Sequence, residues 1–186
     1  MTTVLAVSLA ALFIARGDAA AACIKAPTMT WGDACLKACN TPALYNLCQE
    51  TLLHAPDAAE ATVYALAAAR RAMDSYGATA ARAERLLRGG GGGSPLPGVE
   101  RAAYWHCIGY YTDATSRMAV AAGDLSAGCV VEHTRLEYAQ SVFAVQHCAG
   151  VLTEFQDSPL AALNAADYDL TVLAYDLGAL IVGKQL

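Results

Sequence analysis

The sequence has few charged residues and no cluster of basic ones. Only 16% of its 186 residues are charged, the net charge is −5, and the 12 lysines and arginines are scattered along the chain. A nucleic-acid-binding surface needs a basic stripe with interleaved aromatic side chains, so the chain is not expected to bind nucleic acid. An acidic partner is not expected either.

The apolar N-terminal segment is too short to cross a membrane. LAVSLAALFIA, from Leu5 to Ala15, has about the length of a secretory h-region rather than the ~20 residues of a membrane span. Small residues up to Ala22 offer cleavage sites. We expect residues 1–22 to be a cleaved signal peptide, although no Lys or Arg precedes the segment; the alternative is a buried N-terminal helix. All seven cysteines lie at or beyond Cys23, which agrees with export and disulfide formation.

Motifs for metal binding and catalysis are missing. The histidines show no Glu-x-x-His or His-x-x-x-His spacing, so they predict no metal site and are interpreted as surface residues or neighbours of cysteines. The run Gly89 to Gly93 lacks the Lys and Ser/Thr of a phosphate loop, and no Gly-x-Ser-x-Gly occurs. We assign Asp167, Asp169 and Asp176 to the solvated face of a helix. The sequence therefore predicts no catalytic residue and no cofactor. The histidines are His54, His106, His133 and His147.

Alternating strand patterns are almost absent, and four helical patterns fill the chain after about His54. They are predicted over Asp57–Arg88, from Val99 to Ala122 with an end at Gly123, over Ser126–Phe155, and from an N-cap at Ser158 onward. The predicted apolar stripes are Leu66, Ala69, Met73, Tyr76, Ala80, Ala83 and Leu87; Ala103, Cys107, Tyr110, Ala114, Met118 and Ala121; Leu136, Ala139, Val142, Val145, Ala149 and Leu152; and Leu163, Ala166, Leu170, Leu173, Leu177 and Leu180.

These patterns predict an all-α protein. Four long helices with short connections pack as an antiparallel, up-down-up-down four-helix bundle. We assign residues 56–186 to this bundle and residues 23–55 to a short N-terminal helical extension.

Several motifs resemble the plant invertase and pectin methylesterase inhibitor family. They begin with CNTPALYNLC from Cys39 to Cys48 and continue with AYWHC from Ala103 to Cys107. The chain later has QHC ending at Cys148, SPLAALN from Ser158 to Asn164, and LGALIV from Leu177 to Val182. Together these motifs cover most of residues 35–186.

The resemblance implies two disulfides that staple the fold, Cys39–Cys48 in the extension and Cys107–Cys148 between the second and third bundle helices. Cys23, Cys35 and Cys129 remain, and an odd number leaves at least one free thiol or intermolecular bond. One arrangement pairs Cys23 with Cys35.

The resemblance also implies a secreted inhibitor, in the apoplast or alternatively the vacuole, without a cofactor. Its partner would be an invertase, a glycoside hydrolase, or a pectin methylesterase. Invertase inhibitors of this family insert a Pro-Lys-Phe turn after Gly-Asp into the enzyme, whereas pectin methylesterase inhibitors cover the substrate groove with helix faces. Here Gly123-Asp124 is followed by Leu125-Ser126-Ala127, so the lysine is missing.

The first hypothesis is invertase inhibition, with Asp124, Leu125, Ser126 and Ala127 as the partner-binding turn. It rests on the family motifs near Asn40 and from Ser158 onward. Pectin methylesterase inhibition through helix faces is the alternative. Two further alternatives are a non-inhibitory secreted bundle protein and a carrier of a small hydrophobic ligand.

Overall fold

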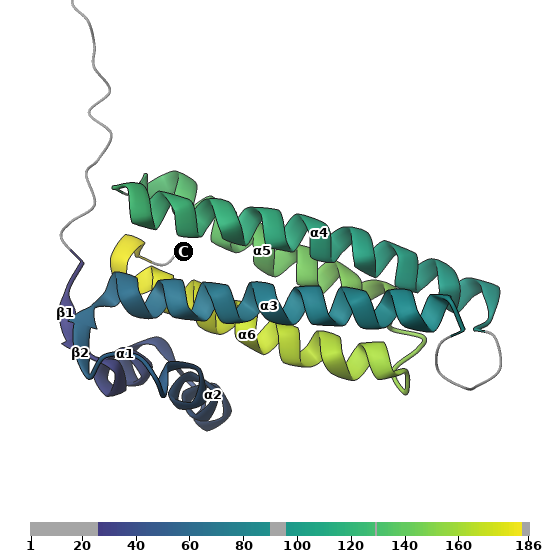
Figure 1. Cartoon of the computed structure of the whole chain (residues 1–186), viewed down its shortest axis with the longest axis horizontal. Coiled ribbons are helices and arrows are strands. Elements are labelled where there is room, and N and C mark those ends of the chain that lie inside the picture. Colours follow the sequence, from purple (N-terminus) through teal and green to yellow (C-terminus); the bar gives the residue numbers. More distant parts are fainter. Residues whose placement is uncertain (1–25, 90–95, 129, 184–186) are drawn as a thin grey trace, which may run out of the picture.

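Four long helices form the body of the protein, and two short ones pack at one end (Figure 1). The computed structural model describes residues 26–89, 96–128 and 130–183. The long helices are α3 (Ala61–Leu87), α4 (Gly98–Ala127), α5 (Val131–Val151) and α6 (Pro159–Val182). Each packs against the next in the chain, and α6 closes back onto α3, so α3 and α5 lie at diagonal corners. The predicted all-α bundle is confirmed.

The N-terminal segment contains α1 (Trp31–Ala38), α2 (Pro42–Leu52) and two strands, β1 (Thr28–Thr30) and β2 (Ala58–Glu60). The strands pair antiparallel, with Met29 opposite Ala59. Three residues are too few to show an alternating pattern, so this ribbon was not predicted. The predicted signal peptide lies outside the described residues.

Side-chain caps fix where three of the helices begin. At α1 the Thr30 hydroxyl accepts a hydrogen bond from the Asp33 amide (3.0 Å). The Thr41 hydroxyl accepts a hydrogen bond from the Leu44 amide (3.2 Å), and Pro42 occupies the first turn of α2. At α6, the Ser158 hydroxyl accepts from the Ala161 amide (3.2 Å), which confirms the predicted N-cap. These bonds satisfy amides that the helix itself leaves without acceptors.

The end of α4 differs from the prediction. Gly123 stays inside the helix, which continues to Ala127 and is capped by Gly128 at φ 116°. A positive φ suits glycine because it has no Cβ, so Gly128 is the residue that ends the helix. The predicted turn at 123–127 is therefore wrong, and those residues form the last turn of α4.

Tyrosines and alanines fill the core between the helices. On α3 and α4 the predicted stripes are confirmed, since their residues are buried or half-buried. Alanine keeps the helix axes close, and large rings occupy the remaining space. The fully buried rings are Tyr64, Tyr76, Tyr104, Tyr111 and Tyr138.

The predicted stripes of α5 and α6 are partly wrong because the middle of the core is polar. Leu136 and Leu163 are exposed, whereas Ser141, Asn164, Asp167 and Thr171 are buried. The Tyr76 hydroxyl lies 2.6 Å from the Thr171 hydroxyl, and the Asn164 amide donates to the Tyr111 hydroxyl (3.0 Å) and the Val145 carbonyl (3.2 Å). Hydrogen bonds offset the cost of burying these groups.

Two of the three aspartates assigned to solvent are buried. Asp167 is 1% exposed and accepts a hydrogen bond from Ser75, and Asp176 is 5% exposed. Asp169 is exposed as expected. The position of Asp167 one turn before Thr171 places both on the polar layer of the core.

The disulfide of the N-terminal hairpin joins Cys35 to Cys48, not Cys39 to Cys48, and the suggested Cys23–Cys35 pair is also wrong. Because α1 and α2 run antiparallel, Cys48 on α2 lies opposite Cys35 on α1, with Cα atoms 5.6 Å apart. Cys39 lies beyond the end of α1, where its Sγ is 3.4 Å from the Leu44 carbonyl oxygen. The Cys107–Cys148 disulfide is confirmed.

Candidate functional site

The residues predicted to form a partner-binding turn form the last turn of α4 instead. Leu125 is buried at 7% exposure, and the Ser126 hydroxyl donates to the Ala122 carbonyl (2.8 Å). The Asp124 carboxylate lies 2.7 Å from Nδ1 of His133 and accepts a hydrogen bond from Thr134 (3.4 Å). Asp124 and Leu125 therefore hold α4 to α5, and neither projects outward as an inserting turn would require.

A small ionic cluster continues from this end. Arg117 on α4 contacts Asp113 (3.2 Å) and Glu137 of α5 (3.3 Å), and these two carboxylates raise the pKa of Arg117. Nε2 of His133 lies 3.6 Å from Glu137. The cluster fixes the register of α4 against α5, because its contacts cross between the helices.

A row of apolar and aromatic side chains lies on the outer surface where α4 meets α5. Phe143 is 53% exposed and Leu136 is 44% exposed. Leu136 and Phe143 are seven positions apart, and Phe143 and His147 are four apart, so all three side chains lie along one side of α5. His147 stacks on Tyr110 of α4, with ring centroids 5.4 Å apart. We call Tyr110, Leu136, Phe143 and His147 the α4–α5 face.

This pair of helices bears much of the exposed apolar surface. In the described ranges, five of the ten exposed large hydrophobic side chains lie on α4 and α5. Exposed aromatic residues are common centres of protein interfaces. The five are Val99, Trp105, Val120, Leu136 and Phe143.

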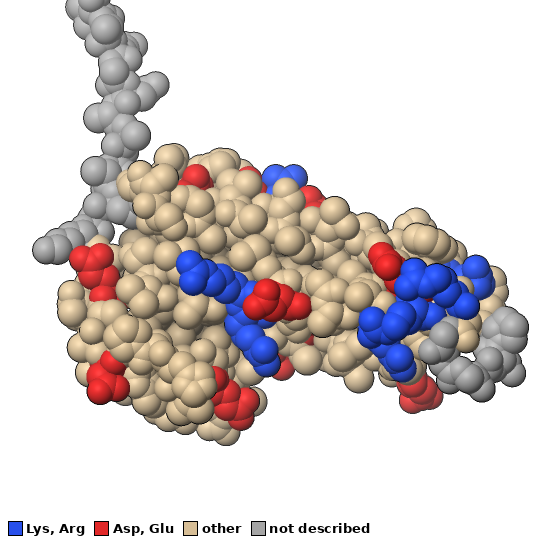
Figure 2. Space-filling view, in the orientation of Figure 1, with Lys and Arg blue, Asp and Glu red and all other residues tan. Residues whose placement is uncertain are grey.

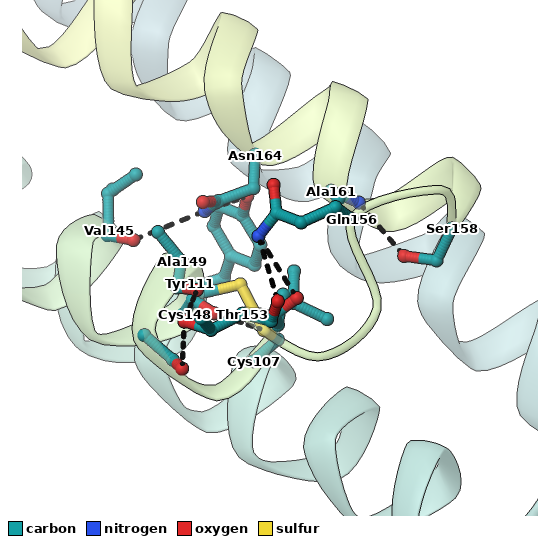
Figure 3. The surroundings of a disulfide bond; sticks show 12 residues. Cys107, Tyr111, Val145, Cys148, Ala149, Thr153, Gln156, Ser158, Ala161 and Asn164 are labelled. Atoms are coloured by element: carbon teal, nitrogen blue, oxygen red, sulfur yellow. Dashed lines mark hydrogen bonds between the residues drawn. A yellow bond between two sulfur atoms is a disulfide. The ribbon is translucent and has the colours of Figure 1, made fainter.

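The Cys107–Cys148 disulfide lies directly below the α4–α5 face. It joins the helices at residues adjacent to His147 and three before Tyr110, with Cα atoms 4.7 Å apart. Beside it, the Gln156 amide donates to the Leu152 and Thr153 carbonyls (3.3 and 3.4 Å), which closes the turn from α5 to α6 (Figure 3). A surface held in this way loses little conformational entropy when a partner binds.

The other residues singled out in the sequence do not assemble into a catalytic group. The four histidines are exposed, and His106 and His147 are neighbours of disulfide cysteines, as predicted. Within residues 26–89, 96–128 and 130–183, no three His, Cys, Asp or Glu side chains are placed to hold a metal ion. In the same ranges, no helix has the length and hydropathy needed to span a membrane.

Comparison with solved structures shows a protein with a similar fold. The fold is similar to that of a pectin methylesterase inhibitor from Arabidopsis, in a crystal structure of a mutant form, with a TM-score of 0.67 and 13% sequence identity. The match covers 82% of this chain and 98% of the other. The chain has the fold of a pectin methylesterase inhibitor. No protein-family model and no curated protein matches the sequence.

Sequence reasoning missed the α4–α5 face because it placed Leu136 in the core. The available signal was the spacing of Leu136, Phe143 and His147, which repeats every seven and four residues. That spacing marks one side of a helix but does not say whether the side is buried. The structure shows that this side is exposed.

Proposed function

We propose that this protein is a secreted, non-catalytic inhibitor of pectin methylesterase that covers the enzyme's substrate groove with the α4–α5 face. The observation that carries the proposal is the row of exposed Leu136 and Phe143 beside the Tyr110–His147 stack, on two helices joined by a disulfide. Such a face combines apolar area with rigidity, which are the requirements for occluding an enzyme without being processed by it.

The end of α4 argues against the insertion mode of invertase inhibitors. That mode needs a projecting turn with a cation, whereas Leu125 is buried and the Asp124 carboxylate is engaged by His133. The solved structure with a similar fold is a pectin methylesterase inhibitor, which makes that enzyme the first target to test.

Invertase inhibition is the second candidate, because the motifs around Asn40 and from Ser158 to Asn164 resemble those of invertase inhibitors. The two candidates call for different contact regions. An invertase inhibitor acting through the helix end would tolerate changes on the α4–α5 face.

The test is a side-by-side titration of the purified, oxidised protein against a plant pectin methylesterase and a plant acid invertase. The proposal predicts that the esterase loses activity up to a one-to-one ratio while the invertase keeps its activity. Inhibition of invertase alone would establish the second candidate. Inhibition of neither enzyme would indicate a non-inhibitory protein with this fold.

A further inference from the structure

The basic residues gather on the outer face of α3 and at the adjoining start of α4 (Figure 2). Arg70 and Arg71 lie midway along α3, and Arg85 and Arg88 lie at its C-terminal end, and all four are exposed. Arg70 and Arg88 are 18 residues apart, which is about five helical turns, so they lie on the same side. Helical periodicity therefore brings arginines that are scattered in the sequence onto one side of α3.

A fifth arginine from α4 extends this line. Arg101 donates a hydrogen bond from Nη1 to the Leu87 carbonyl (3.1 Å), so its guanidinium lies against the last turn of α3. We call Arg70, Arg71, Arg85, Arg88 and Arg101 the arginine strip.

The charge of the strip is largely uncompensated. Residues 61–88 contain five arginines against Asp74 and Glu84, a balance of +3 in a chain whose net charge is −5. Arg88 contacts Glu84 at 3.5 Å on the exposed surface, a pair that contributes little. Within the described part of the chain, Arg70, Arg71 and Arg85 form no ion pair. The strip is therefore available to an anionic partner.

The shape of the strip favours an extended ligand over a protein surface. Arg70 and Arg88 are separated by about 27 Å along a straight helix at ~1.5 Å per residue. Exposed Gly77 and Ala78 lie between the two groups of arginines, and they offer no apolar anchor of the kind that protein interfaces use. Binding there must come from charge and hydrogen bonds distributed along a line.

Carboxylates are among the anions that a guanidinium binds best. A guanidinium forms two parallel hydrogen bonds to a carboxylate, and arginine supplies every cation of the strip. Trp105, four residues after Arg101 and 59% exposed, adds a flat apolar surface at the end of the strip. We propose that the arginine strip binds a linear polyuronate, a polysaccharide with a carboxylate on each sugar, and that the Trp105 ring packs against a sugar.

This binding is independent of the proposed inhibition. Four of the five arginines lie on or at the end of α3, whereas Leu136, Phe143 and His147 of the α4–α5 face lie on α5, at the diagonal corner of the bundle; α4 carries Arg101 of the strip and Tyr110 of the face. The polysaccharide and the enzyme therefore contact different residues, so a substitution can remove one kind of binding and leave the other.

The test measures binding of the full chain to polygalacturonate by isothermal titration calorimetry at low salt. Binding is expected to weaken as salt is added and to vanish with fully methyl-esterified galacturonan. The double variant Arg85→Gln/Arg88→Gln should bind about tenfold more weakly, since two charge-assisted contacts are lost. Lys37→Gln, which removes an exposed cation on α1 outside the strip, should bind like the native protein.

Three results would overturn the proposal: no binding to polygalacturonate, equal loss in the Lys37→Gln control, or tighter binding to polyglutamate or single-stranded DNA at the same charge. Thermal unfolding checks that the double variant is folded. Inhibition of the esterase by the double variant is measured separately and should equal that of the native protein, so failure of this inference is distinct from failure of the proposed function.

Discussion

Replacing Gly178 by alanine tests a close contact between α5 and α6. A Cβ at Gly178 would lie 2.5 Å from Cε2 and 2.8 Å from Cζ of Tyr138. Tyr138 is 1% exposed, and its ring packs edge-on against Tyr175 at 6.4 Å, so the ring has little room to move. Overpacking of this kind costs about 1–3 kcal/mol, and alanine recovers about 1 kcal/mol of helix propensity. We expect a net destabilisation of up to about 2 kcal/mol.

The matched control is Gly77→Ala. Gly77 is an exposed glycine inside α3, and a Cβ there meets no atom within 4 Å. This variant should gain about 1 kcal/mol from helix propensity alone. Urea unfolding of both variants and the native protein provides the comparison. Equal stabilisation by the two substitutions would refute the tight packing of Tyr138 on Gly178.

Three further changes follow from the disulfide, the polar core and the buried tyrosines. Replacing Cys107 and Cys148 together by alanine opens a loop with a sequence separation of 41. The free energy of unfolding, measured in urea, should fall by about 4 kcal/mol. A loss below ~1 kcal/mol would contradict the stabilising role of this disulfide. Asn164→Ala removes two buried hydrogen bonds and should cost about 2–3 kcal/mol in the same assay, whereas an unchanged midpoint would mean that the polar core adds no stability. Burial raises the pKa of Tyr76 to about 12 from 10.0. The folded state therefore holds a proton on Tyr76 that the unfolded state releases above pH 10, and Tyr76 alone should lower the stability by about 3 kcal/mol between pH 10 and 12. Phenolate absorbance of the folded protein should show a late-titrating tyrosine, and a single midpoint near pH 10 would refute this.

The bundle could be predicted from the sequence because each helix is marked by a pattern among residues that are close together in the chain. The alanine-rich stripe of α3 repeats at three and four residues, and Ser158-Pro159 marks the start of α6. Both signals depend on neighbours in the chain, so they need no knowledge of tertiary contacts.

The polar core could not be predicted in the same way. By residue type, Asn164 and Asp167 are expected to face solvent. Their hydrogen-bond partners lie on α3, α4 and α5 and come close to them only in the folded structure. Hydropathy ranks these side chains as exposed, but long-range hydrogen bonds make their burial tolerable. The stripes of α5 and α6 were misplaced for this reason.

The disulfide pairing and the end of α4 depended on register. Cys35 and Cys39 are one turn apart, and the antiparallel alignment of α1 with α2 decides which of them meets Cys48. Gly123 and Gly128 are both glycines near a helix end, and the structure selects Gly128 for the positive φ. In each case the predicted residue lies about one helical turn from the residue that the structure shows.

The most direct test of the central proposal compares the inhibition constants of three proteins against pectin methylesterase. Phe143→Ala removes the more exposed of the two large hydrophobic side chains that α5 contributes to the α4–α5 face and should weaken inhibition by about tenfold. Val63→Ala removes a 40% exposed apolar side chain from α3 and should leave inhibition unchanged. Ser126→Trp places a bulky group at the end of α4, where the sequence predicted the contact, and should also have no effect. Loss of inhibition by Ser126→Trp, with Phe143→Ala unaffected, would contradict the account and return the contact to the helix end.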